Sequence, residues 1–185
     1  MRFATLALLA LTLPAAAQTR PLLLPARDVM VQYALAGTDG ASTGSETWFY
    51  SASAQLFRIE AARMDGYSLL GADNTLRAVN HTIRQVVKVE RRPGGIFGAD
   101  SVFTRLGAEQ VAGRDCTNWR VTAPGGATPP PEVCLTAQGV ILRRRFGNTV
   151  ATATAVTNLA PEQQPADRFA LPPGYPVVIG QTLPR

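Results

Sequence analysis

The residues that could support catalysis are few and scattered. The chain contains one histidine, His81, so a serine or cysteine nucleophile activated by an imidazole would have to use it. His81 lies in residues 80–82 between two predicted strands, which is typical of an exposed turn. Glu60, Asp65 and Asp73 are the carboxylates considered for hydrolysis, but each has a position typical of a solvent face or a turn. We therefore expect no catalytic residues and no enzyme.

Other common ligand chemistries also lack support in the sequence. A single histidine and no grouped carboxylates exclude an ordinary zinc or iron site, so no metal is expected. The paired glycines at 94–95 and 125–126 are not followed by a helix with Lys-Ser or Lys-Thr, so no phosphate loop or cofactor is expected. The densest basic run, Arg143-Arg144-Arg145, has no interleaved aromatic residues, which argues against nucleic acid as a partner.

The first seventeen residues have the layout of a cleavable secretory signal peptide. Arg2 precedes an apolar run at residues 3–13, and Pro14 and three alanines follow before Gln18. The apolar run is shorter than the roughly twenty residues that span a bilayer. We expect cleavage near Ala17, which lowers the net charge from +5 to +4. The product is predicted to be soluble in the periplasm and at most peripheral to a membrane.

Cys116 and Cys134 are the only cysteines of the chain. In an exported protein, an isolated pair is most simply a disulfide that closes a loop of hairpin size. A redox-active pair would be expected to show the Cys-x-x-Cys spacing, which is absent. We predict a structural disulfide that joins a hairpin to its neighbouring strand.

Alternation of apolar and polar residues predicts strands joined by short turns in the first half of the chain. After an ordered lead-in at residues 21–26, Val29, Val31, Tyr33 and Leu35 share one face of the first strand. Asp73-Asn74 is typical of a two-residue hairpin turn. The other predicted strands in this half are residues 46–51, 55–62, 67–71, 75–80 and 84–90.

The second half of the chain predicts one helix and more strands. Residues 100–106 have helical spacing, since Phe97, Val102, Phe103 and Leu106 could line one face. Residues 161–176 contain five prolines and should wrap the surface, with Phe169 and Tyr175 docked at the edge of the core. Strands are expected at residues 109–111, 117–122 and 149–157, and a hairpin at residues 132–146.

These elements predict a mainly β fold in one domain at residues 18–185. About nine or more strands, one or two short helices and no βαβ spacing indicate a curved antiparallel sheet or unclosed β-barrel with a proline-rich C-terminal tail.

The apolar residues of the meander exceed what one short helix and a proline-rich tail can cover, so part of the sheet could enclose a hydrophobic cavity. The alternative is that the large aromatic residues fill the interior as ordinary core, namely Trp48, Phe97, Phe103, Trp119, Phe146 and Phe169. The cavity candidates are Trp48, Tyr50, Leu56, Ile59, Tyr67, Leu69, Leu76, Val86 and Phe103.

The segment 55–90 resembles the LolA/LolB-like family of bacterial periplasmic lipoprotein carriers. The resemblance rests on the order of short motifs Leu56-Phe57-Arg58-Ile59-Glu60, Tyr67-Ser68-Leu69-Leu70, Asp73-Asn74, Leu76-Arg77-Ala78-Val79-Asn80 and Gln85-Val86-Val87. The second half, with its paired cysteines, Gly139-Val140-Ile141-Leu142 and Phe169-Ala170-Leu171-Pro172-Pro173-Gly174-Tyr175, is similar to exported domains of unknown function. The resemblance implies an unclosed barrel with an apolar hollow for acyl chains. It makes Arg58 the first candidate for a polar cavity residue and Arg77 the second.

Three functions remain open at this point. The first is a non-enzymatic periplasmic protein that binds or carries a lipid or another hydrophobic ligand in the hollow. The second is an interaction module whose sheet edge or proline-rich tail docks another envelope protein. A filled interior together with an exposed apolar patch would favour this second function. The third is a hydrolase, which would need a serine and an acid beside His81.

Overall fold

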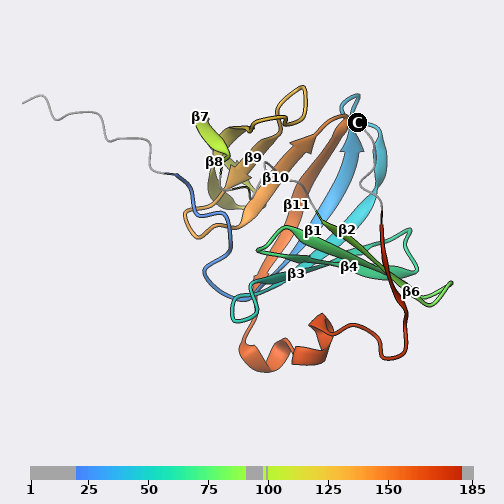
Figure 1. The fold of residues 1–185 in the computed structure, drawn as a ribbon. Helices are drawn as coiled ribbons and strands as arrows, with labels where there is room; N and C mark the ends of the chain where they lie inside the picture. The colour runs from blue at the N-terminus through green and yellow to red at the C-terminus, as the bar shows by residue number, and fades with distance from the viewer. Residues whose placement is uncertain (1–19, 91–97, 99, 181–185) are drawn as a thin grey trace, which may run out of the picture.

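The structure, a computed structural model, describes residues 20–90, 98 and 100–180, and the regular secondary structure of this part of the chain is almost entirely strand (Figure 1). Twelve described strands form one sheet in the order β12-β6-β5-β4-β3-β2-β1-β11-β10-β9-β8-β7. The strands are β1 Val29–Gly37, β2 Ser42–Ser51, β3 Leu56–Ala61, β4 Gly66–Gly71, β5 Thr75–Asn80, β6 Gln85–Glu90, β7 Val102–Val111, β8 Arg114–Thr122, β9 Glu132–Leu135, β10 Ile141–Phe146, β11 Thr149–Asn158 and β12 Val177–Ile179. The predicted mainly β fold with an open, mostly antiparallel sheet is confirmed.

Two meanders share the central strand β1. Strands β1 to β6 follow one another as antiparallel neighbours, and β7 to β11 do the same before β11 pairs with the other edge of β1. Between β4 and β5 the turn residue Asn74 has φ of 61°, a conformation that asparagine tolerates well. The short β12 adds to β6 in parallel. The sheet therefore ends at β7 on one side and at β12 on the other.

The second meander curls strongly. Glu109 on β7 is ion-paired with Arg143 on β10, although β8 and β9 lie between these strands in the sheet order. Strands in a flat sheet are about 4.8 Å apart, so three spacings would exceed the reach of such a pair. Arg114 at the start of β8 also donates to the Val156 carbonyl on β11. These contacts require β7 and β8 to bend back over β10 and β11.

The predicted helix at residues 100–106 is wrong. Residues 102–111 form β7, which pairs along its length with β8 through the turn at Ala112 and Gly113. A bulge between Arg105 and Gly107 breaks the strict alternation of side chains, which explains why the apolar spacing resembled a helix. Pairing with β8 outweighs the weak local pattern. The predicted contribution of Phe97 lies outside the described residues.

Short 3-10 turns are the helical elements of the described chain. They are η1 Pro161–Gln163 and η2 Ala166–Phe169, both within the proline-rich tail rather than at the predicted position. No helix in the described ranges is long and apolar enough to cross a lipid bilayer.

Side-chain alternation gives strands β1 to β6 two apolar faces. On the inner face Trp48 is opposite Ile59 and Tyr50 is opposite Phe57, within a cluster that also includes β1 side chains. On the outer face Tyr67 is opposite Val79, in a cluster covered by Phe169, Leu171 and Tyr175. Residues 165–180, here called the C-terminal strap, thus wrap the surface and dock Phe169 and Tyr175 as predicted.

Candidate functional site

The nine predicted cavity residues do not line one surface. By strand register and packing, Trp48, Tyr50, Ile59 and Leu76 belong to the inner face, and Leu56, Tyr67, Leu69 and Val86 belong to the outer face under the strap. Phe103 lies in a third cluster with Trp119 on β8. The structure therefore divides the predicted set among three clusters.

The inner face is filled by the chain itself. The lead-in packs against it, with Leu24 on the inner cluster and Leu23 on the third cluster. The lead-in is also anchored where the Ala26 N–H donates to the Gln138 carbonyl at 3.0 Å. The cavity that remains between Pro25 and the inner aromatic residues has a volume of about 10 Å³, which is room for roughly one water molecule.

The large aromatic residues are only partly core. Trp48, Phe103 and Trp119 are each 8% exposed and fill the interior. Phe169 is a half-buried residue of the strap that packs against the outer cluster. Phe146, in contrast, is 51% exposed on β10. Phe97 lies outside the described residues. The ordinary-core alternative is thus correct for Trp48, Phe103 and Trp119 and wrong for Phe146.

Arg58 lies on the outer face, where it holds the strap. Its Nε donates to Glu60 at 2.7 Å and its Nη1 donates to the Arg168 carbonyl at 2.7 Å. The guanidinium stacks on Tyr67, 3.6 Å from the ring centroid, and the Tyr67 hydroxyl donates to the Ala170 carbonyl. Burial raises the pKa of Tyr67 against the opposing effect of Arg58. Arg58 is a strap contact and does not face the inner cluster; Arg77, opposite Leu69, shares its face.

The arginine of the inner face is Arg144, which the sequence analysis did not single out. Arg144 is ion-paired with Glu46, and the two side chains are 18% and 17% exposed. Its guanidinium lies 4.7 Å from the Trp48 ring centroid, and Trp48 Nε1 donates to Glu46 at 2.7 Å. Its Nε has no hydrogen-bond partner among the described residues. On a strand, the middle residue of Arg143-Arg144-Arg145 must face away from its neighbours, which was the available clue.

Arg144 also lies near the most deeply buried phenol. Tyr33 is 2% exposed and donates its hydroxyl to the Ile141 carbonyl at 2.7 Å. Burial raises the pKa of Tyr33 well above its usual value, although the positive charge of Arg144 acts in the opposite direction. The group of Tyr33, Glu46, Trp48 and Arg144 is therefore a largely buried structural cluster, in which Glu46 also lines a concavity.

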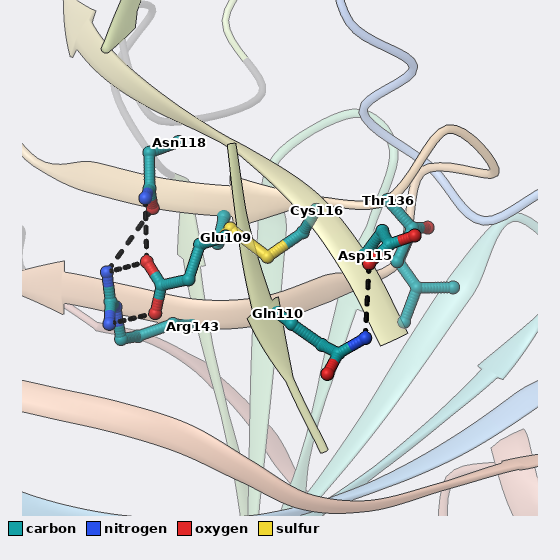
Figure 2. The surroundings of a disulfide bond; sticks show 9 residues. Glu109, Gln110, Asp115, Cys116, Asn118, Thr136 and Arg143 are labelled. Carbon is teal, nitrogen blue, oxygen red and sulfur yellow. Dashed lines mark hydrogen bonds and ion pairs between the residues drawn. A yellow bond between two sulfur atoms is a disulfide. The ribbon is translucent and has the colours of Figure 1, made fainter. Parts of the chain in front are cut away.

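The predicted disulfide is present and ties β8 to β9. Cys116 and Cys134 are bonded with a Cα–Cα distance of 5.4 Å. Figure 2 shows Glu109 beside this bond, accepting hydrogen bonds from Arg143 and from Asn118. The disulfide and this polar cluster together hold the bent β7–β8 hairpin over β10.

A concavity of about 320 Å³ opens next to the disulfide. Its walls include Leu106 of β7, Asn118 of β8, Glu132 of β9, and Arg143 and Arg145 of β10. A second concavity of about 330 Å³ includes Glu46 and Glu60. Those two carboxylates are ion-paired with Arg144 and Arg58, so neither is placed as a free general acid or base.

The remaining chemistry-bearing residues have structural positions. His81 is exposed in the turn between β5 and β6, with its Nδ1 3.1 Å from the Tyr175 hydroxyl. Asp65 accepts from Thr82 at 2.8 Å, and Asp73 accepts from Thr75 in the turn before β5. Within residues 20–90, 98 and 100–180, no three His, Cys, Asp or Glu side chains are grouped as metal ligands.

The two ends of the sheet differ greatly in length. Strand β7 has ten residues and pairs with β8 on one side. Val102 and Leu106 on this strand are 62% and 44% exposed. Strand β12 has three residues. Among the described strands, the longer terminal edge of the sheet therefore belongs to β7, beside the 320 Å³ concavity.

Comparison with known proteins identifies a shared fold but no family. No protein-family model matches the chain, and no curated protein sequence matches it significantly. An uncharacterised conserved protein from Thermus thermophilus is similar, with a TM-score of 0.53 and 13% identity over 82% of this chain and 90% of that one. PNGF-II is similar with a TM-score of 0.56 and 13% identity over 85% of this chain. The match spans about a third of PNGF-II, 31% of its length.

A solved structure of MucB is more distant. Its TM-score is 0.49, with 10% identity over 82% of this chain and 59% of that chain. At this distance it carries no argument about function, and the two structures above show the fold alone. The predicted resemblance to lipoprotein carriers therefore stays at the level of architecture. The disulfide fits an exported protein.

Proposed function

We propose that this chain is an exported, non-enzymatic binding module that recognises an extended segment of another envelope protein by adding it as a strand to β7. The observation that carries the proposal is the edge of β7, which pairs only with β8 among the described strands and exposes Val102 and Leu106 in its N-terminal part. Strand addition uses backbone hydrogen bonds for affinity and side-chain pockets for selectivity.

The filled inner face favours this function over carriage of a hydrophobic ligand. Small-molecule sites usually have volumes of about 300 to 1,000 Å³, whereas the inner cavity has about 10 Å³. A lipid chain would have to displace Leu23 and Leu24, which pack against the apolar clusters. A filled interior with an exposed apolar edge is the combination that favours a protein partner.

Strand β7 has two of the usual protections of a sheet edge, a bulge and the inward charge of Glu109, but it is neither short nor interrupted by proline. Natural proteins shield edges with short strands, prolines, inward charges or bulges. Residues 102–111 contain no proline, and a single bulge interrupts them. By contrast, β12 is three residues long and directly follows Pro176. The edge of β7 is therefore the better template for an added strand.

Selection from a random-peptide display library tests the proposal. The target is residues 18–185 with the disulfide intact. We expect extended peptides whose binding protects the amides of β7 from hydrogen exchange. Leu106→Asp should abolish their binding, because a charged residue of low strand propensity at an edge position opposes strand pairing.

The matched control is Ile83→Asp. Ile83 is 61% exposed in the turn between β5 and β6, so this variant makes the same substitution away from the edge and should keep full binding. The proposal is overturned if no peptide is selected, if the protection maps outside β7, or if Leu106→Asp binds as well as the control.

A further inference from the structure

We infer that the partner segment of β7 is acidic, and that one of its carboxylates enters the 320 Å³ concavity and binds Arg145. This inference rests on the proposed function, which it extends to the chemistry of the partner. It starts from the charge of the second meander and from the ion pairs that the concavity already contains.

Positive charge is concentrated in the half of the sheet that contains β7. Apart from Arg144, which is paired with Glu46 of β2 on the inner face, strands β7 to β10 carry five arginines against three carboxylates. Apart from Glu46, strands β1 to β6 carry three basic and two acidic residues. A surface with an excess of one sign steers and selects a partner of the opposite sign. The edge next to β7 therefore favours an acidic segment over a neutral or basic one.

The carboxylates of the concavity are already paired with other cations. Glu109 accepts from Arg143 and from Asn118. Glu132 lies opposite both Arg120 and Arg145 in the strand register, and its ion pair is with Arg120 at 3.1 Å.

Arg145 is the cation that these pairs do not neutralise. Its side chain is exposed, and the described part of the chain gives it no ion pair. The row of Arg120, Glu132 and Arg145 across β8, β9 and β10 contains two positive charges and one negative charge. A carboxylate from a partner would balance this row, and a guanidinium can hold it with two hydrogen bonds.

The concavity is within reach of a strand added to β7. Leu106 is the extra residue of the β7 bulge and forms one wall of the concavity. A chain paired with the free edge of β7 must pass this wall. Alternate side chains of a strand point to the same face, so one acidic side chain at the level of Leu106 can project toward Arg145.

The same display selection, repeated on two arginine variants, tests the inference. Peptides selected on the wild-type chain should be enriched in Asp and Glu, and peptides selected on Arg145→Gln should lose this enrichment. Arg63→Gln is the matched control, because Arg63 is exposed in the turn between β3 and β4, far from β7 in the strand order. It should keep the acidic preference.

Fluorescence anisotropy then measures the carboxylate directly. One selected peptide is compared with its version carrying Gln in place of the key Glu or Asp. At about 20 mM salt we expect the acidic peptide to bind about threefold to fivefold more tightly, and at about 500 mM salt this ratio should fall toward one. On Arg145→Gln the two peptides should bind equally at either salt concentration.

The outcomes separate the inference from the proposed function. Peptides that bind β7 with no acidic preference, or with a preference that Arg145→Gln retains, overturn the inference and leave strand addition in place. Failure to obtain any peptide that protects β7 overturns both.

Discussion

Arg144 is a cation held at the apolar inner face by one carboxylate and one indole. Glu46 accepts from Arg144 and from Trp48, so removal of its charge leaves the guanidinium with little compensation at an 18% exposed site. We expect Glu46→Gln to lower the free energy of unfolding by about 2 kcal/mol. Urea unfolding at neutral pH measures this loss.

The exposed Arg120–Glu132 pair is the matched control for that prediction. These side chains are 47% and 34% exposed, and exposed ion pairs contribute less than about 1 kcal/mol. Glu132→Gln should therefore cost clearly less than Glu46→Gln. Equal costs for the two variants would mean that the inner cluster has no special role in stability.

The contribution of the turn before β5 to stability depends on pH through the carboxylate of Asp73. The backbone N–H of Thr75 donates to its carboxylate, and this hydrogen bond is the main cause that lowers the pKa of Asp73. A lowered folded-state pKa contributes stability above the unfolded-state value of about 3.9, and this contribution is lost as the pH falls through the folded-state value. Asp73→Ala should cost less than about 1 kcal/mol at neutral pH, and still less at about pH 2.

Unfolding of Asp73→Asn provides the control for this titration. Asparagine can still accept from the Thr75 N–H but does not ionise. The difference in stability between this variant and Asp73→Ala should therefore not change with pH. A cost of Asp73→Ala that is the same at both pH values contradicts the assignment.

At the scale of elements, the C-terminal strap is held by polar contacts to its own backbone in addition to the packing of its apolar side chains. Arg58 donates to the Arg168 carbonyl and Tyr67 donates to the Ala170 carbonyl. Further along, Val86 N–H donates to the Pro176 carbonyl and Gly180 N–H donates to the Lys88 carbonyl. Loss of one such contact, worth about 1 kcal/mol, should raise local opening of the strap about fivefold.

Tyr67→Phe is the substitution that isolates one strap contact, because it removes the hydroxyl and keeps the ring on which Arg58 stacks. Hydrogen exchange should be faster at the amides of Val86 and Gly180. The amides of β1 and β11, in the middle of the sheet and away from the strap, should exchange unchanged. Uniform acceleration over the whole chain would show that the strap does not open separately.

Strand pairing explains which elements could be predicted from the sequence. The hairpins of the first meander follow from local alternation and from turn residues such as Asn74. The pairing of β1 with β11, and of β12 with β6, joins residues far apart in the chain, and local patterns contain no information on it. The β7 bulge at Leu106 disturbed the alternation enough to suggest a helix.

The residues of the candidate site were predicted less well than the strands. Which face of the sheet a side chain occupies depends on the pairing register of its strand, and the sequence does not give this register. A shift of one residue moves a side chain to the opposite face of a sheet. Leu56 and Ile59 are both apolar and near in sequence, yet they lie on opposite faces. Sequence alone also provided no indication that the lead-in would fill the inner face. The disulfide, in contrast, was correctly predicted because only one pairing of two cysteines exists.

At the scale of the whole molecule, the disulfide links the β7–β8 hairpin to the rest of the sheet. Its two cysteines are 18 residues apart, and a loop of this size is expected to contribute about 3 kcal/mol by limiting the unfolded chain. For a chain of this length that loss corresponds to a decrease in Tm of roughly 6 to 12 °C. We expect this decrease in the variant with Cys116→Ala and Cys134→Ala, measured by thermal unfolding.

The same variant tests whether the edge of β7 depends on the disulfide. The ion pair of Glu109 with Arg143 still connects β7 to β10 in the absence of the sulfur atoms. Because one of the two connections is lost, hydrogen exchange of the double variant at low temperature should show faster opening of β7 and β8. The exchange of β1 to β6 should be unchanged. Adding Glu109→Gln removes the second connection, and peptide binding at β7 should then be lost together with protection of the hairpin. If the hairpin stays protected in this triple variant, pairing between β8 and β9 alone positions the binding edge, and the disulfide contributes only to global stability.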